Sequence, residues 1–140
     1  QGFSCRRSEV SGRRFWGGLA ERFGKAESFF SNHFVSNYCP LVFMEESGRN
    51  LTPDKLPAAV AKPVESACDA YLRRIAELLE PAWVVGVGKY ALGQAQRALQ
   101  ESEVQLTSIL HPSPANPAAN KDWAGAATRA LIETGIWQDS

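Results

Sequence analysis

The residue best suited to chemistry in this sequence is His111, which follows an apolar run and precedes proline. A strand on one side and a proline ring on the other restrict its backbone, so the imidazole would be held rigidly. No metal site is expected here, because His33 is the only other histidine and no cysteine lies at ligand spacing. A Ser-His-Asp triad with Ser113 is not favoured, since a serine between two prolines lacks the Gly-x-Ser-x-Gly geometry that exposes a nucleophile.

The segment after this histidine is a candidate binding loop. It consists of Pro112, Ser113, Pro114, Ala115, Asn116 and Pro117. Three prolines so close together exclude a helix and hold the residues before them extended. This pattern predicts a rigid loop suited to insertion or to contact with phosphate. A lone histidine is more often structural than functional, so the functional interpretation of His111 depends on this loop.

Two more candidate positions follow predicted strands, namely Asn37 and the Gly86-Val87-Gly88 sequence. Ligands of α/β sheets gather beyond the carboxyl ends of the strands, which gives polar residues there more weight. Gly-x-Gly is similar to a dinucleotide-binding loop, but the third glycine is missing and no acidic residue ends the following strand. We favour glycines that let a strand turn sharply into a helix. A small nucleotide-binding protein remains an alternative.

The three cysteines, Cys5, Cys39 and Cys68, are odd in number and far apart, with no Cys-x-x-Cys pair. This spacing excludes a zinc ribbon and an iron–sulfur cluster held by four thiolates. Cys39 and Cys68 lie in apolar stretches, which predicts buried, reduced thiols in an intracellular protein.

Length and composition indicate one soluble globular domain. The chain has 140 residues, of which 44% are hydrophobic and 21% charged, and no apolar run is long enough to span a membrane. The 15 basic and 15 acidic residues cancel, but residues 1–25 are basic. This segment could attract phosphate, although a solvated helix face explains the charge equally well. The first residue is Gln1 and no signal peptide follows, so we expect a cut end.

Apolar periodicity and turn residues predict the elements that position these groups. The expected helices cover residues 12–24 behind a Ser11 cap, 52–80 with a break permitted at Pro63, 89–101, and a last helix capped by Asn120 and ended by Gly135. The expected strands lie within 34–44, interrupted at Asn37 and Pro40, and over 83–88 and 104–110. Strands alternating with helices imply parallel pairing. We expect one α/β domain over residues 1–140, a three-layer helix-sheet-helix sandwich with a central, mainly parallel sheet.

Five stretches, in order along nearly the whole chain, resemble the single-strand-selective monofunctional family of uracil-DNA glycosylases. They are Ser11–Gly17, Phe34–Leu41, Ser47–Pro53, Val85–Gly88 and His111–Trp123. The last is the most specific, and the three-layer α/β fold of that superfamily agrees with the fold expected above. The resemblance implies hydrolysis of the bond between deoxyribose and uracil or a 5-modified uracil, in single-stranded and duplex DNA. It further implies base flipping, no cofactor, no lyase step, no membrane association, and a monomer in the nucleus of a eukaryote or the cytoplasm of a bacterium.

The resemblance also implies residue roles. Asn37 would read the flipped base, because a side-chain amide can accept from uracil N3–H and donate to O4. His111 would hydrogen-bond the base O2, where negative charge collects as the bond breaks. The loop Pro112–Pro117 would press against the DNA strand, with Ser113 and the amino end of the Asn120-capped helix meeting phosphate.

The sequence departs from the family in two places. The first motif, a Gly-Met-Asn-Pro-Gly-Pro-type segment whose asparagine positions the attacking water, is absent, so we expect the chain to be the carboxyl-terminal part of the enzyme and the fold to be incomplete at its N-terminus. Ala115 stands where relatives place a long basic side chain in the wedge. A non-catalytic nucleic-acid-binding module on the same fold is therefore the strongest alternative.

Overall fold

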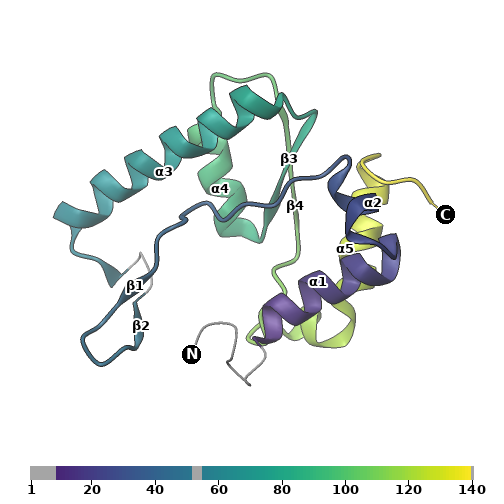
Figure 1. Cartoon of the computed structure of the whole chain (residues 1–140), viewed down its shortest axis with the longest axis horizontal. Helices are drawn as coiled ribbons and strands as arrows, with labels where there is room; N and C mark the ends of the chain where they lie inside the picture. Colours follow the sequence, from purple (N-terminus) through teal and green to yellow (C-terminus); the bar gives the residue numbers. More distant parts are fainter. Residues whose placement is uncertain (1–8, 52–54, 140) are drawn as a thin grey trace. The chain divides into compact units, whose positions relative to one another are not determined.

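The computed structural model describes residues 9–51 and 55–139, and Figure 1 labels its elements. The chain divides into two compact units. Unit 1 comprises residues 1–34, 85–92 and 107–140, and unit 2 comprises residues 35–84 and 93–106. Within the described residues, no helix is long and apolar enough to cross a membrane.

The first helix of unit 1, α1 (Val10–Phe23), begins earlier than predicted. Its cap is Glu9 rather than Ser11, because the Glu9 carboxylate accepts hydrogen bonds from the backbone N–H groups of Gly12 and Ser11. These hydrogen bonds lower the pKa of Glu9. The helix ends at Gly24, whose φ of 70° suits glycine. A short helix, α2 (Ala26–Phe30), follows.

The last helix, α5 (Pro117–Glu133), also has a different cap from the one predicted. The Asn116 side chain accepts from Ala118 N–H, whereas the Asn120 amide donates to the carbonyl of Pro114 at 2.9 Å. The helix is kinked at Asp122, whose carboxylate accepts from Gly125 N–H. Asp122 therefore caps the second part of the helix, which ends at Glu133, and Gly135 with its φ of 76° follows the Thr134 cap, close to the predicted end.

The core of unit 1 lies where α5 packs on α1 and on the end of a strand. Trp123 is 5% exposed, and the centroid of its ring lies 5.7 Å from that of Phe15. Its indole N–H donates to the carbonyl of Leu110 at 2.6 Å. The buried side chains are Ile109, Ala119, Trp123, Ala127 and Leu131. Trp123 thereby links helix packing to the residue directly before His111.

Two parallel strands and the helix between them confirm the α/β class. β3 (Trp83–Val87) pairs with β4 (Gln105–Ile109), and α4 (Lys89–Ala98) connects them. The hydrogen bonds from Gln105 to Ala82 and from Gly88 to Ile109 run in parallel register. A side chain at Gly86 would lie 2.5 Å from the Leu92 nitrogen, so this glycine lets α4 start close against the strand, as predicted.

The remaining elements belong to unit 2 and differ from expectation in one place. Helix α3 (Ala58–Leu79) runs through Pro63 without a break, and the helix start expected at residues 52–54 lies outside the described residues. The strand predicted within 34–44 is reduced to β1 (Phe43–Met44), which pairs antiparallel with β2 (Asn50–Leu51). Residues 34–42 form no strand, and the hydroxyl groups of Ser36 and Tyr38 bond to side chains of α3 instead.

Candidate functional site

His111 lies just beyond the end of β4 in unit 1 and is exposed. The backbone N–H of Ser113 lies 3.1 Å from its Nδ1. A backbone N–H only donates, so Nδ1 is the acceptor and the neutral ring carries its proton on Nε2. The ring is thus held by the first turn of its own loop, with a hydrogen-bond donor on the other nitrogen.

Gly88 forms the surface behind this histidine. A Cβ at position 88 would lie 2.9 Å from the Cβ of His111, and the φ of Gly88 is 96°. Its N–H also donates to the Ile109 carbonyl at 2.9 Å. Both the close approach and the left-handed backbone require glycine, so only a glycine at position 88 lets the backbone after β3 pack this closely against His111. Close packing and backbone conformation thus explain both glycines of the Gly86–Gly88 sequence, and no bound nucleotide is needed to explain them.

The loop Pro112–Pro117 is held by side chains of two helices, α1 and α5. Arg14 of α1 donates to the carbonyl of Pro112 at 3.1 Å and to Oδ1 of Asn120 at 2.8 Å, while Asn120 in turn donates to Pro114. Within the loop, Ala115 N–H donates to the Ser113 hydroxyl. Pro112 is buried, whereas Pro114, Ala115 and Pro117 are exposed. The structure confirms a loop over residues 112–116, with Ala115 on its exposed part, whereas Pro117 is the first residue of α5, where a proline without an N–H is tolerated.

The basic segment is only partly available to a ligand. Arg14 is committed to the loop, and Arg22 donates to Gln138 and lies 4.7 Å over the Trp137 ring. Arg13 and Lys121 are exposed and line a hollow of about 290 Å³ between α1 and the start of α5. These two cations are therefore better placed to contact an anion than those two arginines.

Asn37 lies in unit 2 on an irregular stretch, and its side chain is exposed. Both neighbours are anchored to α3. The Ser36 hydroxyl lies 3.0 Å from that of Tyr71, and the Tyr38 hydroxyl donates to the Asp69 carboxylate at 2.6 Å. This anchoring, rather than strand pairing, fixes the backbone that carries the amide.

Asp69 is the charged centre of this anchor. It is 9% exposed and receives two hydrogen bonds of 2.9 Å from Arg97 of α4, whose guanidinium also lies 2.9 Å from the Glu65 carboxylate. The Arg97 hydrogen bonds, helped by Tyr38, hold the pKa of Asp69 below its ordinary value. Burial and the neighbouring Asp69 carboxylate raise the pKa of Tyr38, which keeps its hydroxyl protonated as a donor.

The predicted burial of the cysteines is correct for one of them. Cys68 is buried, and its burial together with a hydrogen bond to Cys39 raises its pKa to about 11. Cys39 is only half-buried, and Cys5 lies outside the described residues. A thiol with this pKa is protonated at neutral pH and is a poor nucleophile. Among the described residues, no three His, Cys, Asp or Glu side chains are grouped so as to hold a metal ion.

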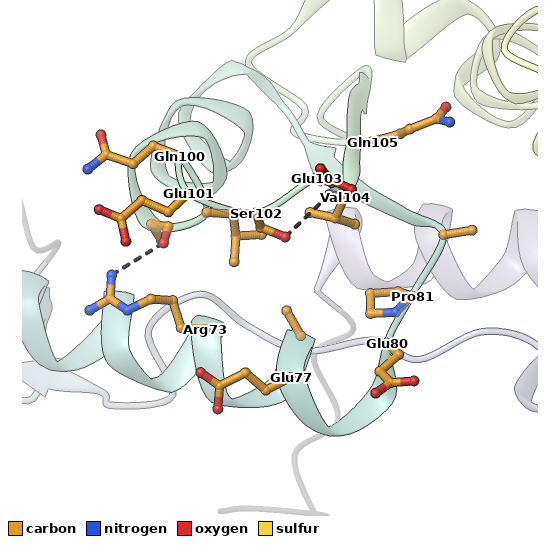
Figure 2. A pocket seen from close by; sticks show the side chains of 14 residues that line it. Arg73, Glu77, Glu80, Pro81, Gln100, Glu101, Ser102, Glu103, Val104 and Gln105 are labelled. Carbon is orange, nitrogen blue, oxygen red and sulfur yellow. Dashed lines mark hydrogen bonds between the residues drawn. The ribbon is translucent and has the colours of Figure 1, made fainter.

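A larger hollow, of about 880 Å³, lies elsewhere in unit 2 and contains none of the predicted site residues (Figure 2). Its charged lining is Arg73, Glu77, Glu80, Glu101 and Glu103. Arg73 donates to the Ala98 carbonyl at 3.3 Å, as the dashed line in Figure 2 shows. Four carboxylates against one guanidinium repel phosphate, so this hollow is unsuited to DNA.

Comparison with known proteins shows which enzymes this chain resembles. No protein-family model matches the chain. The chain is 49% identical over 137 residues to the single-strand selective monofunctional uracil-DNA glycosylase of Rattus norvegicus, and 48% and 47% identical to those of Mus musculus and Bos taurus. Each alignment covers 96% of this chain. The chain spans about half the length of the curated relatives it matches.

The chain is thus a relative of the uracil-DNA glycosylases. Within that class it is homologous, over nearly all its residues, to the enzymes named single-strand selective and monofunctional, which confirms the resemblance of the five stretches. The structure adds residues that sequence reasoning missed, namely Arg14, Tyr38, Asp69 and Arg97. They act through partners distant in sequence. Gly88 was predicted only as a turn glycine, and the structure adds its close approach to His111.

We expect the Asp69 anchor to stabilise the fold in a pH-dependent way. Because its pKa is depressed below the ordinary 3.8, the stabilisation is complete above that value and is lost as pH falls through the lower pKa of the folded state. Asp69→Asn should lower the free energy of unfolding by about 1–3 kcal/mol at about pH 7, since an amide N–H then faces a donor, and by less at about pH 2. Urea unfolding at both pH values measures this.

Glu46→Gln, at an exposed carboxylate of the same unit, is the control and should change stability by less than about 0.5 kcal/mol. An Asp69→Asn loss of equal size at both pH values would show that the ionised carboxylate is not what stabilises the unit.

Proposed function

We propose that this chain is part of a uracil-DNA glycosylase, a base-excision repair enzyme that hydrolyses the N-glycosidic bond of uracil in DNA without a lyase step. The observation that carries this proposal is the fixed His111 ring with its donor at Nε2, in a chain about 48% identical to enzymes of that name. The substrates are uracil and 5-modified uracils, in single-stranded and duplex DNA.

His111 serves the reaction as a positioned hydrogen-bond donor. As the bond between sugar and base breaks, negative charge develops on the base O2, and Nε2–H donates to it. The Ser113 hydrogen bond and the Gly88 backbone keep the ring in place before the charge develops. A preorganised donor of this kind contributes about 3–4 kcal/mol to stabilising the transition state.

Asn37 serves recognition. Its amide oxygen accepts from uracil N3–H and its NH₂ group donates to O4, whereas cytosine presents the opposite pattern. The target nucleotide must leave the base stack to be read in this way, at a cost of a few kcal/mol that is smallest in single strands. The exposed Asn37 side chain is accessible to such a base.

The loop after His111 contacts the DNA backbone. Its exposed residues and the nearby cations Arg13 and Lys121 form a surface that a phosphate chain can approach. The hydrogen bonds of Arg14 and Asn120 hold this loop in one conformation, so it stays rigid when it presses against the DNA strand.

The experiment that tests this function is release of uracil from a labelled single-stranded oligonucleotide. It is performed on the protein extended upstream to the length of its relatives. We expect release by this form, and far slower release by the 140-residue chain, whose sequence contains no Gly-Met-Asn-Pro-Gly-Pro-type segment. His111→Leu should reduce the rate about 10²–10³-fold with the fold intact. Binding without release would instead identify a nucleic-acid-binding module, and a loss of only a few-fold in His111→Leu would leave this residue structural.

Ala115 predicts a preference for single strands. One methyl group on the exposed part of the loop cannot fill the gap left by a flipped base or displace a counterion, so the cost of unpairing a duplex is poorly offset. Ala115→Arg should raise the activity on duplex DNA and steepen its salt dependence by about one counterion, with little change on single strands.

Initial rates on both substrates at two salt concentrations measure this effect. Ala118→Arg, at an exposed position in the first turn of α5, is a matched control for the added charge. Equal improvement on single strands and duplex by Ala115→Arg would rule out a wedge at this position.

A further inference from the structure

The side chain of Asn37 makes no hydrogen bond to any other described residue, so only the backbone that carries it determines where the amide lies. That backbone lies on a stretch with no regular secondary structure. Ser36 and Tyr38, directly before and after Asn37, are both tied to α3 through their hydroxyl groups. Asn37 therefore lies between two residues whose side chains are hydrogen-bonded to α3.

The anchor at Tyr38 is the stronger of the two. Its hydroxyl donates to the Asp69 carboxylate at 2.6 Å and accepts from Arg97 Nη2 at 2.9 Å, while Arg97 holds the same carboxylate through Nε and Nη2. The carboxylate is buried, and its orientation is fixed by α4. The three groups close a ring of hydrogen bonds whose directions are fixed, because the arginine only donates and the carboxylate only accepts, so the tyrosine hydroxyl accepts from the first and donates to the second.

We propose that Tyr38, Asp69 and Arg97 are positioning residues for base recognition, which hold the backbone of Asn37 where its amide can meet uracil. This inference rests on the role of Asn37 in the proposed function. Fixing the backbone on both sides limits the positions from which that amide meets the base, and displacement by about 1 Å can cost about 100-fold in rate.

A double-mutant cycle on the upstream-extended protein tests this inference. The variants are Tyr38→Phe, which removes only the hydroxyl, Asn37→Ala, and the two combined. We expect Tyr38→Phe to lower kcat/KM for uracil release from single-stranded DNA about ten-fold in the wild-type background, and less than about two-fold when Asn37 is already alanine. If release becomes too slow to follow, the same four proteins can be compared by their Kd for a single strand carrying 2′-fluoro-deoxyuridine, which resists hydrolysis.

Arg97→Gln should reproduce the Tyr38→Phe loss. Arg74→Gln is its matched control, because Arg74 also lies in an ion pair of unit 2, with Glu77, but does not contact the stretch around Asn37. We expect Arg74→Gln to leave uracil release within about two-fold of wild type.

Three results would overturn the inference. Equal losses from Tyr38→Phe in both backgrounds would show that Tyr38 acts independently of Asn37, and the absence of any loss would show that its hydroxyl positions nothing. In either case a slow Asn37→Ala variant would leave the proposed function intact. Normal uracil release by Asn37→Ala would instead overturn the role of Asn37 itself, and this inference with it.

Discussion

The hydrogen bond from the Ser113 backbone to Nδ1 of His111 determines what this imidazole can offer a ligand. It places the proton of the neutral ring on Nε2 and fixes the ring relative to its own loop. The rest of unit 1 supports this contact. Trp123 holds the carbonyl of Leu110, directly before the histidine, and Gly88 leaves room for the ring behind it. Arg14 and Asn120 hold the loop that follows. A loop of three prolines with these attachments has little conformational freedom left to lose on contact with DNA.

The two segments with proposed roles are organised in the same way. Neither Asn37 nor the residues 112–116 belong to a helix or a strand, and both are held by side chains that reach them from helices. In each case an arginine completes the attachment, Arg14 for the loop and Arg97 for the stretch around Asn37. Guanidinium groups suit this work, because several donors in one plane can hold two partners at once. The cost is that these arginines are not free to bind phosphate, and Arg13 and Lys121 remain exposed for that purpose.

Local patterns in the sequence predicted the elements that local physics determines. The β3-α4-β4 unit followed from short apolar runs bounded by proline and glycine, and the loop after His111 followed from its prolines. The caps at Ser11 and Asn120 were wrong, because both helices begin earlier, where Glu9 and Asn116 accept from the first free N–H groups. The strand expected from residue 34 was wrong for a different reason. Its apolar residues favour a strand, but its hydroxyl groups find partners on α3, more than 25 residues away. No local pattern singles out Arg14 or Arg97, since their partners lie 98 and 28 positions away and no spacing rule relates them.

The tautomer of His111 can be read from long-range ¹H–¹⁵N correlations of the ring nitrogens at about pH 8, above the ordinary imidazole pKa of about 6.5. His33 provides a comparison within the same spectrum. Its Nε2 accepts from the Trp137 indole at 3.0 Å, and its Nδ1 lies 2.9 Å from the Phe29 carbonyl, which requires the proton on Nδ1. We expect opposite tautomers, with the proton on Nε2 in His111 and on Nδ1 in His33. A proton on Nδ1 of His111 would contradict the claim that the loop presents this imidazole as a hydrogen-bond donor at Nε2.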